Sequence, residues 1–128
     1  MIEITIIFIL LYLIEAFHDN YVIRDSGKSA YYNRLWHKTD AMFHFTMWVA
    51  FAWMLKDWKI IPLGACVRLS VFQNTLNILR DKGFFYLGDG GIDGFLKRMF
   101  GSWGGPLLFS AAVSAIVVLN LMYAGSAG

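Results

Sequence analysis

Three ionisable residues close an apolar N-terminal stretch, in the sequence EAFHD at residues 15 to 19. Glu15, His18 and Asp19 stand at i, i+3 and i+4, and at about 100° per residue these positions share one face of a helix. Ionisable side chains inside apolar helices are costly, so their presence indicates a paired or functional role. This polar face is the first candidate for chemistry.

A second polar face follows in the next apolar segment. His37, Asp40 and His44 stand at i, i+3 and i+7, and with His18 they include all three histidines of the chain. Imidazole nitrogens and carboxylate oxygens on facing helices are ligands that zinc, iron and manganese accept. The expected metal ligands are Glu15, His18, His37 and His44, and the expected acid–base residues are Asp19 and Asp40.

A third polar face lies in the segment after Pro62. Four polar residues there recur at i, i+3, i+4 and i+7, namely Ser70, Gln73, Asn74 and Asn77. We expect Asn77 and the nearby Arg80 to bind the polar head of a substrate. Arg68 lies about 180° from Asn77 on an ideal helix, so we expect it to pair with Glu3 instead.

The composition indicates a membrane protein. Hydrophobic residues make up 58% of the 128 residues and charged residues 16%, whereas about a quarter of the residues of a soluble domain are charged. The single cysteine, Cys66, excludes a disulfide framework within the chain and a cysteine-based metal site. The N-terminal segment carries Glu3 in place of a basic start and has no small-residue cleavage site, so we expect it to be retained.

Four segments are expected to cross the membrane as helices, approximately residues 3–23, 38–56, 60–80 and 105–125. Each supplies the roughly 20 residues that a span needs. The last carries no charge, whereas the third is the hardest to insert, because Arg68 at mid-helix costs about 3 kcal/mol. Residues 92–100 have an apolar face and a basic face, which predicts a short interfacial helix. The expected fold is a single all-α domain, a four-helix transmembrane bundle with an interfacial helix before the last span.

Basic residues decide the expected orientation. With four spans, the loops on one side hold Arg24, Lys28, Arg34, Lys38, Arg80, Lys82, Lys97 and Arg98, and the other side holds only Lys56 and Lys59. The positive-inside rule places the first group in the cytoplasm and both termini on the non-cytoplasmic side. The three polar faces then meet at the cytoplasmic ends of their helices.

Two functions fit these expectations. In the first, the protein is a small membrane metalloprotein that uses a divalent zinc, iron or manganese ion on a lipid or another membrane-borne substrate. In the second, it is a structural or accessory subunit of a membrane complex or lipid-containing particle, without catalytic activity, and the same residues hold its helices together. A proton or ion path, and a haem held between His18 and His44, are further alternatives.

The expected partners are membrane lipids, including anionic headgroups at the basic face, and other copies or subunits in the membrane. A net charge of +2, with basic residues close to a bilayer, gives no extended stripe for nucleic acid. The glycine-rich GDGGIDG is interpreted as a turn in which Asp93 caps the following helix. It lacks both the Gly-Lys-Ser/Thr element of a phosphate loop and the acidic twelfth position of a calcium loop.

Overall fold

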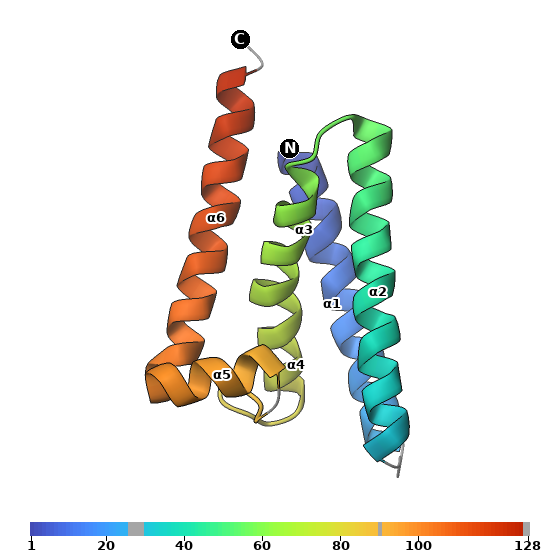
Figure 1. Ribbon diagram of the computed structural model, residues 1–128, viewed down its shortest axis with the longest axis vertical. Helices are drawn as coiled ribbons and strands as arrows, with labels where there is room; N and C mark the ends of the chain where they lie inside the picture. Colours follow the sequence, from blue (N-terminus) through green and yellow to red (C-terminus); the bar gives the residue numbers. More distant parts are fainter. Residues whose placement is uncertain (26–29, 90, 127–128) are drawn as a thin grey trace.

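The computed structural model describes the backbone of residues 1–25, 30–89 and 91–126, and the side chains of residues 1–20, 39–89 and 91–125. Within these residues the secondary structure is entirely helical, as the sequence predicts. Four long helical segments run alternately up and down, and a short helix crosses the lower end (Figure 1). In chain order the elements are α1 (Ile2–Asp25), α2 (Ala30–Leu55), α3 (Ile60–Val67), η1 (Arg68–Phe72), α4 (Gln73–Leu79), α5 (Gly91–Phe100), η2 (Gly101–Trp103) and α6 (Gly104–Ser126).

The third long segment is a continuous helix, residues 60–79, with a π-helical turn, η1, in its middle. The backbone N–H of Gln73 donates to the carbonyl oxygen of Arg68, five residues earlier, where an α-helix has a spacing of four. The Asn74 amide donates to the carbonyl oxygen of Ser70 at 2.6 Å, so a side chain also bonds to the backbone of this wider turn. The extra residue rotates the two halves of the helix by about 100° relative to an ideal helix. Arg68 and the polar face of α4 are therefore no longer opposite each other.

The buried core lies between α1, α2 and α3. Phe8, Tyr12 and Ala16 recur every fourth residue along α1 and are almost completely buried. They belong to one cluster with Ala52, Ile60, Leu63 and Val67. Gly64 lets the Trp48 indole approach closely, because a Cβ at this glycine would lie 2.5 Å from the ring. Small residues at helix contacts allow this close packing.

The outer surface of the helices is apolar. Ile6, Leu10, Ile14 and Phe17 form an exposed stripe along α1, and large hydrophobic side chains are exposed on α2 and α6 as well. Several polar residues are buried instead, namely Thr5, Asp19, His44, Ser70, Asn74 and Asn77. Soluble proteins rarely expose large contiguous apolar patches, whereas large apolar side chains are exposed here on α1, α2 and α6.

One stretch is long and apolar enough by itself to cross a membrane, Gly91–Gly125, and most of it is α6. Among the described residues, no other helix meets the same criterion.

Asp93 fastens α5 to the rest of the bundle. It lies in the first turn of α5, and its Oδ2 accepts hydrogen bonds from the backbone N–H of Gly88 at 3.2 Å and from the side-chain amide of Gln73 in α4 at 3.3 Å. The sequence predicts that Asp93 caps the start of α5. In the structure its carboxylate instead connects α5 to the preceding loop and to α4. Burial raises the pKa of the Asp93 carboxyl above its ordinary value, and the hydrogen bond from Gly88 only partly opposes this effect.

This link predicts a pH dependence of stability. Since the pKa of Asp93 is raised in the folded state, its contribution to stability is complete below the unfolded pKa of about 4 and is lost as pH rises through the folded pKa. We expect Asp93→Asn to remove this loss, measured as the melting temperature in detergent between pH 4 and 8. Asp89→Asn is the control. Because Lys97 lowers the pKa of Asp89, the contribution of Asp89 to stability is present at higher pH and is lost as the pH falls, which is the opposite of Asp93. A pH profile that Asp93→Asn leaves unchanged would contradict the assignment.

Candidate functional site

Four ionisable side chains from three helical segments meet inside the bundle. These four residues, here called the ionic cluster, are Glu15 of α1, Asp40 and His44 of α2, and Arg68 of η1. Arg68 Nη2 donates to Glu15 Oε1 at 2.7 Å and also to Asp40 Oδ2. His44 Nε2 lies 2.8 Å from Glu15 Oε2, and His44 Nδ1 lies 3.3 Å from Asp40 Oδ1. Every carboxylate oxygen of the cluster therefore has a partner within it.

Both ring nitrogens of His44 face oxygen acceptors. Nε2 faces the Glu15 carboxylate, and Nδ1 lies 2.9 Å from the backbone carbonyl oxygen of Asp40, which can only accept a hydrogen bond. The ring therefore fits this site with a hydrogen on both nitrogens. In that form the cluster holds two carboxylates, one guanidinium and one imidazolium, and it carries no net charge.

Aromatic rings surround the cluster. The Arg68 guanidinium lies 4.4 Å from the centroid of the Phe72 ring and 5.9 Å from that of Tyr12. The Tyr12 ring is also 5.5 Å from His44, and its hydroxyl accepts a hydrogen bond of 2.6 Å from Trp48 Nε1. Such a setting adds cation–π attraction and keeps the local dielectric low, which strengthens the ion pairs.

The cluster lies near the middle of the helices, deeper than the sequence predicts. Glu15 is ten residues before the end of α1, and Asp40 is ten residues after the start of α2, which is about 15 Å along each axis. Arg68 is likewise near the middle of residues 60–79. The difference arises because α2 begins at Ala30, eight residues before the predicted span.

Glu15, Asp40 and His44 could hold a metal ion, since one ligand atom from each lies within 4.8 Å of the others. The guanidinium of Arg68, however, already lies between the two carboxylates. A histidine ligand also needs a nitrogen with a free lone pair, and both nitrogens of His44 face acceptors. A metal would therefore have to displace Arg68 and change the protonation of His44.

The other predicted ligands and acid–base residues lie outside this cluster. The side chain of His18 is 73% exposed, with Nδ1 3.5 Å from Asp19 Oδ1, whereas His44 is buried. His37 lies outside the residues whose side chains the structure describes. Asp19 is buried, and its Oδ2 has no hydrogen-bond partner among the residues whose side chains are described. His18 is turned about 60° from Glu15 around the helix axis, which is enough to move it from the interior to the surface.

The two predicted substrate-binding residues have different surroundings. The Asn77 amide is buried and donates to the carbonyl oxygens of Phe84 at 3.2 Å and Tyr86 at 2.9 Å, so it holds the loop after α4 in place. Arg80 is exposed at the same end of the bundle. The structure thus gives Asn77 a role within the chain.

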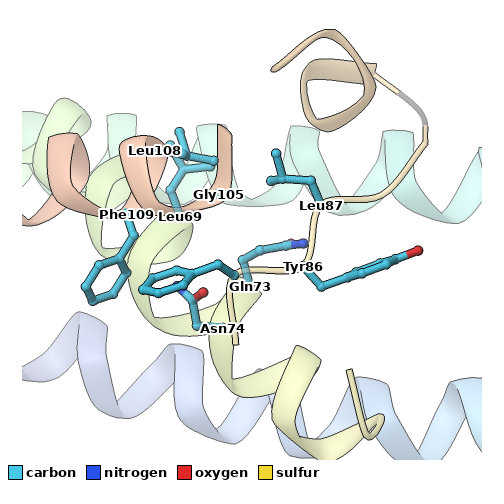
Figure 2. A pocket seen from close by; sticks show the side chains of 9 residues that line it. Leu69, Gln73, Asn74, Tyr86, Leu87, Gly105, Leu108 and Phe109 are labelled. Carbon is cyan, nitrogen blue, oxygen red and sulfur yellow. The ribbon is translucent and has the colours of Figure 1, made fainter. Parts of the chain in front are cut away.

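A small cavity lies beside this loop, where it packs against η1, α4 and the start of α6 (Figure 2). Its lining includes the amides of Gln73 and Asn74, together with Tyr86 and Gly105. The cavity volume of about 10 Å³ accommodates roughly one water molecule. It is too small for the head of a lipid substrate.

The ion-pair partners of Arg68 differ from the one that the sequence predicts. We expected a pair with Glu3, but the structure shows Arg68 bound to Glu15 and Asp40. The expectation assumed an ideal helix, and the π-helical turn at Arg68 changes the direction of the side chains on either side of it. The sequence carries no signal for this pairing, because Asp40 stands at the start of the predicted span 38–56 and lies near the middle of α2 only once that helix begins at Ala30.

No protein-family model, curated protein or solved structure matches this chain. The function is therefore inferred from the arrangement of its residues.

Proposed function

We propose that this chain is a small polytopic membrane protein that serves as a structural or accessory subunit, in which the ionic cluster holds three membrane-embedded helices in register. The observation that carries this proposal is that a single guanidinium nitrogen, Arg68 Nη2, binds carboxylates from two other helices. The two ring nitrogens of His44 lie within ion-pair distance of the other oxygen of each carboxylate. The four charges balance within the cluster, as expected for a structural link, although Arg68 Nε is buried and has no hydrogen-bond partner among the described residues.

The surface of the helices supports membrane embedding. The four long segments contain 24, 26, 20 and 23 residues, or about 30–39 Å at 1.5 Å per residue, against a hydrocarbon thickness of about 30 Å. Their exposed side chains are largely apolar, and six polar residues of the first three segments are buried, namely Thr5, Asp19, His44, Ser70, Asn74 and Asn77. Ionisable residues in membrane bundles pair in this way. The outer faces would contact lipids, further copies of the chain or other subunits.

The distribution of charge supports an orientation with both termini on the non-cytoplasmic side. The chain termini lie toward one end of the helices and α5 lies across the other (Figure 1). The end with α5 carries Lys97 and Arg98, and the loop before it carries Arg80 and Lys82, whereas the α2–α3 turn at the opposite end carries only Lys56 and Lys59. Cytoplasmic loops carry such an excess of basic residues.

A second candidate function is that of a membrane metalloprotein acting on a lipid or another membrane-borne substrate. The geometry of Glu15, Asp40 and His44 favours it, because nitrogen and carboxylate ligands at this spacing suit zinc, iron or manganese. In this candidate Arg68 leaves the carboxylates when the metal binds. Asp19, buried nearby on α1, would then be the remaining acid–base group.

Elemental analysis distinguishes the two functions. For wild-type protein purified in detergent without chelators, we expect a metal content well below one ion per chain, because Arg68 already neutralises the carboxylates. His44→Ala removes a ligand, and Glu3→Gln is the matched control, since Glu3 is exposed on the same helix as Glu15. About one ion per chain in wild type and Glu3→Gln, lost in His44→Ala, would overturn the structural proposal in favour of the metalloprotein.

A further inference from the structure

An open groove of about 300 Å³ lies at the turn between α2 and α3. This turn is at the end of the bundle opposite α5 (Figure 1). Ala52, Trp53, Lys56 and Trp58 line it. The two tryptophans are 74% and 59% exposed, so the groove has large apolar walls and a single ammonium group. Its volume is at the lower end of the range of ligand-binding pockets.

Lys56 occupies a position that normally favours glycine. The helix α2 ends in a Schellman motif, in which the N–H of Asp57 donates to the carbonyl oxygen of Ala52 at 3.0 Å and the N–H of Lys56 donates to that of Trp53 at 3.3 Å. This places Lys56 in the left-handed conformation, with φ of 52°, where a side chain carries a steric cost. The helix dipole favours a cation near this end, but it does not require one in the left-handed position. Strain of this kind is a reason to look for a function.

The ammonium group of Lys56 is available to a ligand. The neighbouring Asp57 interacts with Lys59, since its Oδ1 accepts the backbone N–H of Lys59 at 3.0 Å and its Oδ2 lies 4.0 Å from Lys59 Nζ. Lys59 also lies 5.7 Å from the centroid of the Tyr123 ring. Among the described residues, no carboxylate lies within ion-pair distance of Lys56. The groove therefore combines an uncompensated positive charge with two exposed indoles.

We propose that Trp53, Lys56 and Trp58 bind the headgroup of an anionic phospholipid. Lys56 binds the phosphate, and the indoles contact the glycerol backbone and the first part of the acyl chains, which matches the usual place of tryptophan at the membrane interface. This proposal rests on the proposed membrane embedding, which places the α2–α3 turn at the level of the headgroups on the non-cytoplasmic side.

Quenching of tryptophan fluorescence by brominated lipids tests the proposal on the full-length protein in bilayers. We expect brominated phosphatidylglycerol to quench wild type at an about fivefold lower mole fraction than brominated phosphatidylcholine, the preference expected from one lysine near an anionic lipid. Lys56→Gln and Lys56→Gly should lose this preference, and Lys59→Gln should retain it. Lys56→Gly should also raise the melting temperature, because glycine relieves the left-handed position, so its loss of preference cannot come from misfolding.

Three outcomes would overturn the proposal. One is equal quenching of wild type by the two lipids, and another is a preference that both Lys56 variants retain. The third is binding of free glycerol phosphate as tight as that of phosphatidylglycerol, which would assign the groove to a soluble phosphate compound. A wild-type protein that stays monodisperse without detergent and is quenched by neither lipid would instead refute the membrane embedding itself, so the two failures are distinguishable.

Discussion

Arg68→Gln is expected to lower the free energy of unfolding of the detergent-solubilised protein by about 3–5 kcal/mol, the usual cost of removing one partner of a buried ion pair. The variant leaves Glu15 and Asp40 inside the bundle without the guanidinium that now bonds to both. The two carboxylates would repel each other in a setting of low dielectric. Unfolding followed by circular dichroism, with denaturant titration in a fixed detergent, measures the loss.

A rescue experiment separates charge from packing. Replacing a buried ion pair by neutral groups is often tolerated, so the triple variant Glu15→Gln, Asp40→Asn, Arg68→Gln should be more stable than Arg68→Gln alone. Arg80→Gln is the matched control, because Arg80 is exposed just after the end of the same helical segment and should change stability by no more than about 0.5 kcal/mol. If Arg68→Gln were as mild as Arg80→Gln, or if the three substitutions were simply additive, the ionic cluster would not hold the helices together.

Gly105→Ala is expected to destabilise the protein by about 1–3 kcal/mol, the range for an overpacked contact. A Cβ at this glycine would lie 2.1 Å from the carbonyl oxygen of Phe85 and 2.9 Å from the Phe85 Cβ. Backbone atoms cannot move away as easily as the end of a side chain can, so the loop after α4 must shift from α6. The shift would also weaken the edge-on contacts of Phe109 with Phe84 and Phe85, whose ring centroids lie 5.4 and 5.7 Å away.

Hydrogen exchange locates this effect, and a second glycine controls for it. We expect faster exchange of the backbone amides of residues 83–89 in Gly105→Ala, together with a lower melting temperature. Gly125→Ala lies on the same helix with nothing within 4 Å of its Cβ, so it should be neutral or stabilising by up to about 1 kcal/mol through helix propensity. Wild-type stability and wild-type exchange in Gly105→Ala would contradict the close approach of α6 to the loop.

The helical character of the chain and the places of most helices can be predicted from the sequence. Apolar runs bounded by glycine, proline and charge predict helices near 92–100 and 105–125, and the structure has α5 at Gly91–Phe100 and α6 at Gly104–Ser126. The start of α2 was less predictable. It begins at Ala30, because a helix can continue through polar and aromatic residues beyond the apolar run, and hydropathy measures transfer to lipid rather than helix formation.

The candidate site could be predicted only in part. Helical spacing placed Glu15, Asp40 and His44 on polar faces, and these three residues do come together. The same spacing could not separate His18 from Asp19, since both are within about 60° of Glu15 around the axis. Which of them points inward depends on where the neighbouring helices pack, and in the structure Asp19 is buried while His18 is exposed.

By itself, then, the sequence determined that the chain is helical, where most of its helices lie and which of their faces are polar, because these properties depend on residue types at short and regular spacing. Only the tertiary structure decided that Arg68 is the counter-ion of Glu15 and Asp40. That pairing needs a π-helical turn, which changes the direction of the Arg68 side chain. It also needs three helical segments that are distant along the chain to pack with their middles together. Periodicity contains no information on either, since the free energy of the turn and of the ion pairs is set by contacts that exist only once the helices have packed.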